Sequence, residues 1–194
     1  MNIRSLLLLP LTIFALAAGC ASSSSPVASD DLPASGVLPP PYTAAELRAA
    51  NPAGTRLAFR LEPVGAAAVE QVIEFVSVDR DHAMMQSHAR DAAGVMTGSV
   101  ERSQATWSEL RDHAAFSAER ARRVRAVRPT PFGALPGWEY TVEEEPIEGL
   151  AVVSTYHFAD GRPGPPVAME VRHGDAVTLR MTMIADSRAT VAGR

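Results

Sequence analysis

The chain has 194 residues, with 18 basic and 22 acidic side chains and a formal net charge of −4. This mild acidity provides no basic surface of the kind that nucleic-acid binding requires, so we expect no nucleic-acid partner. Every basic residue is arginine, which excludes Schiff-base and phosphate-loop chemistry that depends on lysine. The lone cysteine, Cys20, excludes an intramolecular disulfide framework, so packing must hold the fold together.

Residues 1–19 have the three parts of a secretory signal. Arg4 supplies a positive charge, an apolar stretch runs from Leu6 to Ala18, and small residues precede the break point. A transmembrane helix needs about 20 apolar residues, more than this stretch contains, so a permanent membrane span is the weaker interpretation. The segment therefore predicts export.

The end of this segment, Ala18-Gly19-Cys20, runs into a polar serine tract. The motif resembles the lipobox of bacterial lipoproteins, with Ala17 at the position where leucine is most common. The resemblance implies a diacylglyceryl group on the thiol of Cys20, cleavage before that residue and, usually, acylation of the new amino terminus. Ala21 replaces the aspartate that favours inner-membrane retention in that family, which implies the outer membrane if the organism has two.

We therefore expect a cell-envelope protein whose membrane partner is reached through acyl chains, such as palmitate, on Cys20. Two or three acyl chains make anchoring stable where one is marginal. An alternative stays open, in which the protein is secreted, cut after Ala18 and left with a free thiol.

Composition divides the rest of the chain into three parts. Residues 20–41 contain six serines and five prolines and predict a disordered tether after the lipidated cysteine. Residues 42–187 predict a single β-rich globular domain, because apolar and polar residues alternate in most of its runs. Residues 188–194 predict a disordered tail.

Two capping boxes predict two short helices. Thr43 with Glu46 opens the first, which ends at Asn51 because a proline follows. Thr106 with Glu109 opens the second. Residues 117–128 are ambiguous, because apolar residues spaced by three favour a helix while the run leads into a proline-rich turn; we expect a helix ending near residue 116 and a strand from residue 122.

Alternating runs predict the remaining strands at residues 55–62, 69–78, 82–90, 95–102, 138–143, 150–158, 167–172 and 177–183. The last four suggest an antiparallel meander with one apolar face, and Gly174-Asp175 is a two-residue hairpin signal. No βαβ rhythm occurs, which argues against a parallel sheet. The predicted fold class is mainly β, a β-rich α+β domain with a curved antiparallel sheet or half-barrel of about nine strands and two short helices.

A second resemblance covers nearly all of the predicted domain. Its motifs are Thr106-Trp107-Ser108-Glu109-Leu110 with His113 and Phe116, Thr130-Pro131-Phe132-Gly133 before Trp138-Glu139-Tyr140, and Pro163-Gly164-Pro165-Pro166-Val167. The order of these motifs is similar to that in a family of uncharacterised secreted bacterial lipoproteins, and the strands entering after a Gly-Pro-Pro turn resemble lipoprotein-carrier half-barrels. The resemblance implies a fold and no chemistry.

One apolar face of the final meander is the best candidate for a binding surface. It combines Tyr156, Phe158, Met169, Met181 and Met183. Methionine side chains are flexible and polarizable and fit irregular apolar shapes, so this face suits a lipidic ligand. It equally suits an ordinary core.

We predict no catalytic, metal or cofactor site. The five histidines lack metal-binding spacing, and no nucleophile elbow or nucleotide-binding glycine loop occurs. Glu143-Glu144-Glu145 and an arginine cluster could be partner surfaces or could face each other across the sheet, but a solvated face is the favoured interpretation of both. The members of that cluster are Arg120, Arg122, Arg123, Arg125 and Arg128.

These observations favour a non-enzymatic, lipid-anchored envelope protein that binds a hydrophobic ligand or an envelope partner. An envelope hydrolase is one alternative, which a cleft that brings together polar groups such as His157 and Glu170 would support. A structural or assembly component is another, for which a large exposed apolar patch without a pocket is expected.

The substitution Cys20→Ala tests the predicted anchor. We expect the variant to lose both the acyl mass and its membrane association, because the thiol carries the first acyl group. Intact-mass measurement and membrane fractionation of both proteins give the answer, and an unchanged membrane fraction would contradict the anchor.

Overall fold

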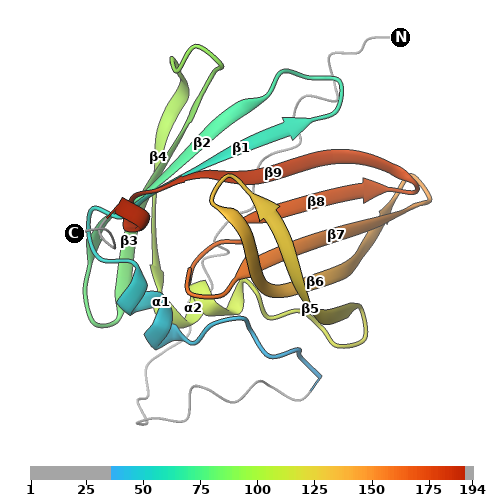
Figure 1. Ribbon diagram of the computed structural model, residues 1–194, viewed down its shortest axis with the longest axis horizontal. Helices are drawn as coiled ribbons and strands as arrows, with labels where there is room; N and C mark the ends of the chain where they lie inside the picture. The colour runs from blue at the N-terminus through green and yellow to red at the C-terminus, as the bar shows by residue number, and fades with distance from the viewer. Residues whose placement is uncertain (1–35, 191–194) are drawn as a thin grey trace.

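The computed structural model describes residues 36–190. Nine strands form one antiparallel sheet in the order β4-β3-β2-β1-β9-β8-β7-β6-β5 (Figure 1). The sheet is open, with β4 and β5 as its edges within the described part of the chain. The strands are β1 Arg56–Pro63, β2 Val69–Val78, β3 His82–Arg90, β4 Met96–Thr106, β5 Ala121–Thr130, β6 Gly133–Ile147, β7 Leu150–Ala159, β8 Ala168–His173 and β9 Ala176–Asp186.

Two short helices, α1 Ala44–Ala50 and α2 Trp107–Asp112, precede β1 and follow β4, and a 3-10 turn, η2 Ser187–Thr190, follows β9. Both predicted capping boxes are present. The Thr43 hydroxyl accepts from the Glu46 amide and the Glu46 carboxylate accepts from the Thr43 amide, and Thr106 with Glu109 repeats the arrangement. These bonds satisfy amide groups that a helix of one or two turns leaves unpaired.

The predicted mainly-β fold with about nine antiparallel strands and two short helices is confirmed. The meander β6-β7-β8-β9 and the β3–β4 hairpin pair as expected. In the ambiguous run, residues 121–130 are strand. All ten residues are in register with β6, and the hydrogen bonds of this antiparallel ladder outweigh what a short exposed helix would gain.

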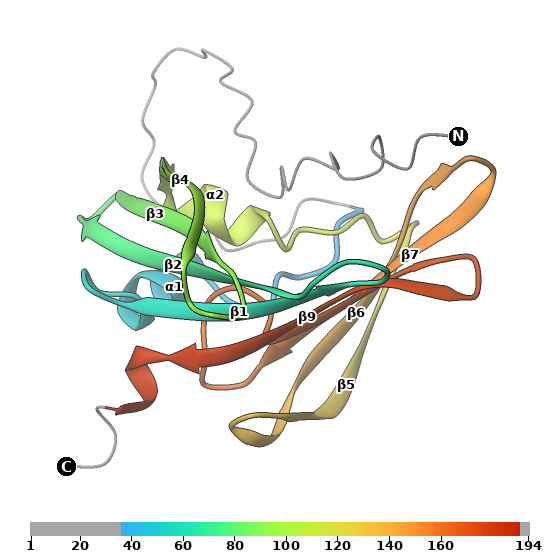
Figure 2. The ribbon, with the colours of Figure 1, turned by 90° about the horizontal axis from the view of Figure 1, so that it is seen from above.

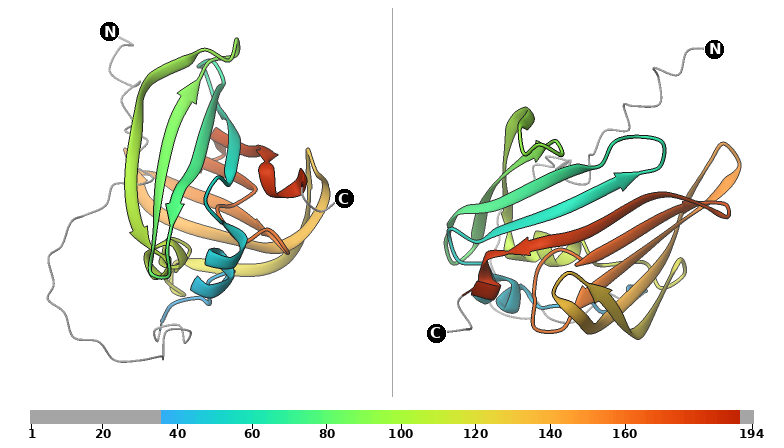
Figure 3. Two further views of the ribbon diagram at one scale, coloured as in Figure 1. Left: turned by 90° about the vertical axis from the view of Figure 1, so that its left-hand side faces the viewer. Right: turned by 45° about the horizontal axis from the view of Figure 1, so that its top comes forward.

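Both helices lie on one face of the sheet (Figure 3). The larger apolar cluster lies between this face and the helices and includes Leu47, Phe59 and Phe75. A second cluster, around Tyr140 and Phe158, lies toward β5. The turn of the β5–β6 hairpin folds back, so that its apolar residues also pack against the larger cluster.

The boundaries of the folded domain are wider than predicted. The Tyr140 hydroxyl donates to the carbonyl oxygen of Pro39 at 2.6 Å, and Val37 forms a β-bridge with Ser117, so residues 36–41 belong to the domain rather than to the tether. Arg188 hydrogen-bonds Asp186, so the domain also extends past residue 187. Composition misplaced both ends because a few long-range hydrogen bonds hold them.

The predicted signal segment, Cys20 and most of the tether lie outside the described residues, as do residues 191–194. Within residues 36–190, neither α-helix has the length and apolar character that crossing a membrane requires.

Gly137, in the middle of β6, tests how tightly β6 and β7 pack. A Cβ atom at this position would lie 2.0 Å from the backbone oxygen of Phe158, which cannot move without breaking the ladder. We expect Gly137→Ala to lower the free energy of unfolding by about 3 kcal/mol in urea titrations. Ala134→Gly, at an exposed position of the same strand, is the control and should cost about 1 kcal/mol or less. Equal stability of the two variants would contradict this packing.

Candidate functional site

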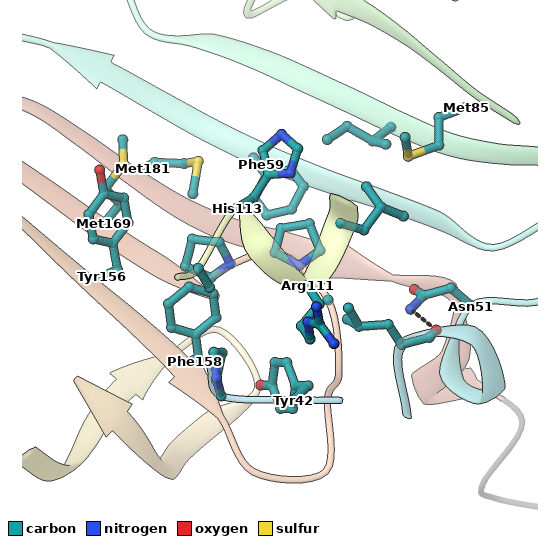
Figure 4. Close-up of a pocket in the computed structure, with 18 of the residues that line it drawn as sticks. Tyr42, Asn51, Phe59, Met85, Arg111, His113, Tyr156, Phe158, Met169 and Met181 are labelled. Atoms are coloured by element: carbon teal, nitrogen blue, oxygen red, sulfur yellow. Dashed lines mark hydrogen bonds between the residues drawn. The ribbon is translucent and has the colours of Figure 1, made fainter. Parts of the chain in front are cut away.

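A cavity of about 220 Å³ lies between the helix-facing side of the sheet and the two helices (Figure 4). Strands β1, β2, β3, β7, β8 and β9 supply its walls, and α1, α2 and the loop between β7 and β8 supply its cover. The alternation of the strands explains the lining, because every second residue points toward the helices. Most lining side chains are apolar.

One end of the cavity is closed by aromatic packing. Trp107, the first residue of α2, stacks on Phe75 of β2 with ring centroids 6.2 Å apart and an interplanar angle of 8°. The Trp107 indole donates to the carbonyl oxygen of Asp79 at 3.1 Å, which fixes the ring and the β2–β3 turn together. Leu47 and Met85 are buried at the same end.

The opposite wall contains the predicted ligand face. Tyr156, Phe158, Met169 and Met181 all line the cavity, and Figure 4 shows them together on the neighbouring strands β7, β8 and β9. Met183 does not line it. That side chain is fully buried opposite Phe59 and is part of the core.

Aromatic contacts hold the segment around Phe116, which follows α2, against β6 and β7. The Phe116 ring lies 5.1 Å from Tyr156 and 5.2 Å from Tyr140. Tyr42, just before α1, packs edge-on against Phe158 and donates its hydroxyl to the carbonyl oxygen of Ala159 at 2.6 Å. Burial raises the pKa of Tyr42 above its ordinary value and that of Tyr140 to about 12, so both phenols stay protonated as donors.

A hydrogen-bond network braces the closed end. Asn51 lines the cavity and donates from its side chain to the carbonyl oxygens of Leu47 and Pro163, at 2.7 and 3.1 Å. Arg188 donates to the Asn51 side-chain oxygen and to Pro163. The α1 helix, the β7–β8 loop and the carboxyl end of the domain are thereby joined.

Asp186 holds this network in place. Its side chain is completely buried and pairs with Arg162 at 2.7 Å and Arg188 at 2.8 Å. Burial by itself raises the pKa of Asp186, but the hydrogen bonds and charge of Arg188, with the hydrogen bond from Arg162, outweigh it and hold the pKa below its ordinary value. The ionised carboxylate therefore stabilises the folded state.

The other end of the cavity is the more exposed one. Leu47, Trp107 and Met85 are at most 6% exposed, whereas Met181 and Tyr156 are half-buried. The side chains at this end are therefore less completely covered than those around Trp107.

The cavity contains few polar side chains. The Tyr156 hydroxyl lies 3.5 Å from the Glu144 carboxylate, and burial raises the pKa of Tyr156. Nδ1 of His113 lies 2.7 Å from the carbonyl oxygen of Glu109, and Arg111 pairs with Asp112. Gln71 adds an amide. With so few polar groups facing it, the cavity suits an apolar ligand rather than a charged one.

His157 and Glu170, which the hydrolase alternative would bring together in a cleft, lie outside the cavity. His157 is buried, donates from Nε2 to the carbonyl oxygen of Leu135 at 3.1 Å, and its pKa is lowered by burial. Glu170 pairs with Arg172 and Arg180. Neither side chain lines the cavity, and alternation places both on the opposite face of the sheet from Tyr156 and Met169.

The charged clusters meet across neighbouring strands. Arg120 pairs with Glu145 and Arg128 with Glu139. Arg123 stacks over the ring of Trp138, 3.5 Å from its centroid. Among residues 36–190, no group of three or more histidine, cysteine, aspartate or glutamate side chains is placed to hold a metal ion.

No protein-family model, curated protein sequence or solved structure matches the chain. The lipobox and the similarity to secreted lipoproteins stay predictions. Sequence reasoning missed the other half of the cavity, in particular Phe59, Ile73 and Phe116. The sequence does show the alternation of the first strand and the presence of Phe116 in the helix motif. Neither signal indicates that these residues line one cavity together with residues of the final meander.

The buried ion pairs of Asp186 predict a pH-dependent stability. Asp186→Asn should lower the free energy of unfolding by about 3 kcal/mol at pH 7, because it leaves two arginines without their carboxylate. Since the pKa is lowered in the folded state, this contribution is complete above the unfolded value of about 3.9 and is lost as the pH falls through the folded value. The gap between wild type and variant in urea titrations should therefore narrow below pH 4.

The exposed pair Arg56–Glu74, 2.8 Å apart, provides the matched control. Glu74→Gln should cost at most about 1 kcal/mol, because solvent screens this pair. Equal losses for Glu74→Gln and Asp186→Asn at pH 7 would contradict the role given to Asp186.

Proposed function

We propose that this protein is a non-enzymatic, lipid-anchored binding module of the cell envelope whose cavity holds a small hydrophobic ligand. The cavity of about 220 Å³, lined by four of the five residues of the predicted ligand face, carries the proposal. A dry cavity of about 150 Å³ already binds benzene, so a ring or a segment of an alkyl chain fits this volume.

The chemistry of the lining supports a ligand of this class. Met169 and Met181 adapt to irregular apolar shapes, and Tyr156 and Phe158 offer rigid aromatic surfaces. The polar groups of the closed end are engaged with one another, as the bonds of Asn51 show, so they add little recognition of charge.

The lipid anchor of the proposal rests on the lipobox motif at Cys20. The hydrolase alternative draws no support from the cavity, because His157 and Glu170 lie outside its lining. A purely structural role is the weaker alternative, because it does not require a cavity.

Filling the cavity tests the proposal. Met181→Trp should weaken binding of the apolar dye N-phenyl-1-naphthylamine at least tenfold in a fluorescence titration, because the larger side chain occupies the mouth. Thr182→Trp, on the same strand but facing away from the cavity, is the control and should change the affinity less than twofold. Failure of the wild-type protein to bind the dye, or equal affinities for the two variants, would contradict the proposal.

A further inference from the structure

The β6–β7 hairpin has an apolar tip at one end of the sheet. The β6–β7 turn places Ile147 directly opposite Leu150, and these side chains are 45% and 53% exposed. The two residues between them, Glu148 and Gly149, have φ angles of 51° and 78°, as in the tight turns that suit the twist of a hairpin. A fixed turn therefore presents two large apolar side chains to solvent.

An apolar path joins this end to the cavity. Val171 and Leu179 pair with each other on β8 and β9, two residues beyond Met169 and Met181, and both are half-buried. Figure 2 shows the β6–β7 and β8–β9 turns projecting past the helices at the same end of the molecule. Met169 and Met181 are the cavity residues of β8 and β9, so this part of the cavity lies toward these turns.

The chain also enters the domain here. The amide of Ala118 donates to the carbonyl oxygen of Gly36 at 2.8 Å, shortly before β5 begins at Ala121. That first residue of β5 pairs with Val142, near the end of β6 that leads to the apolar turn. Residues 21–35 separate Gly36 from Cys20, and a chain of this length reaches at most about 50 Å when fully extended.

We propose that the β6–β7 turn docks on the surface of the bilayer, so that the mouth of the cavity faces the lipid and takes an acyl chain from it. The proposal rests on the proposed function, because it assigns the ligand of the same cavity. A bilayer, rather than a protein, is the occupant because a lipid-anchored Cys20 holds this end of the domain within reach of the membrane.

Charge does not drive the docking. The turn carries Glu148, which is exposed, and Glu145 nearby is paired with Arg120. Insertion of apolar side chains into the interface is the contact that remains, and it is insensitive to salt.

Tryptophan quenching by brominated phosphatidylcholine tests the docking. The protein is anchored on phosphatidylcholine vesicles through Cys20, by its own acyl groups or through a maleimide lipid. The Leu150→Trp variant should be quenched at least threefold more strongly than Met96→Trp, its matched control. Met96 is also 53% exposed but lies at the β3–β4 turn, which points in a different direction (Figure 1). Raising sodium chloride from 0.05 to 0.5 M should change the ratio of quenching between Leu150→Trp and Met96→Trp less than twofold.

A second variant separates docking from folding and from ligand binding. Adding Ile147→Asp to the Leu150→Trp variant should reduce its quenching to the level of the Met96→Trp control, while dye binding in solution and the circular dichroism spectrum stay unchanged. Equal quenching of Leu150→Trp and Met96→Trp, with the dye still bound, overturns the docking and leaves the proposed function standing. Failure of the wild-type protein to bind the dye overturns the proposed function itself.

Discussion

The structure depends on how the apolar side of its sheet is covered. At about 1.5 Å per residue, the seven residues of α1 span roughly 10 Å, whereas the eleven residues of β9 span roughly 35 Å at about 3.3 Å per residue. Helices this short cannot cover strands of that length. The core therefore closes tightly around Trp107 and leaves a cavity where the cover thins toward Met181.

The network around Asp186 makes this partial cover stable. Short helices contribute little by themselves, because helix formation needs several turns to overcome its nucleation cost. Here α1 is held by Asn51, which bonds both the helix end and the β7–β8 loop, and Arg188 and Asp186 anchor that bond to the end of β9. The closed end is thus held by a hydrogen-bond network, while the contacts around Met181 at the other end are mainly apolar.

The cavity thus has one end held by hydrogen bonds and one end that is mainly apolar, and this difference supports the proposed function. A ligand held by contacts with Met169 and Met181 gains from burial of apolar surface and from little else, so selectivity rests on size and shape. The exposed Ile147 and Leu150 lie toward the mouth and not toward the braced end. The proposed binding and the proposed docking therefore involve the same end of the sheet.

The sequence by itself determined most of the strands and the capping boxes, and it placed four of the cavity residues on one apolar face. Alternation and capping are local properties that a strand or helix carries wherever it is placed. It left open whether residues 117–128 are helix or strand, and it misplaced the domain boundaries at Pro39 and Arg188, because these depend on partners far along the chain. The tertiary structure alone decided that Phe59 and Ile73 line the same cavity as Tyr156 and Phe158, and that Met183 fills the core rather than the cavity. A cavity is the space between elements, so its existence follows from how they pack and from no single segment.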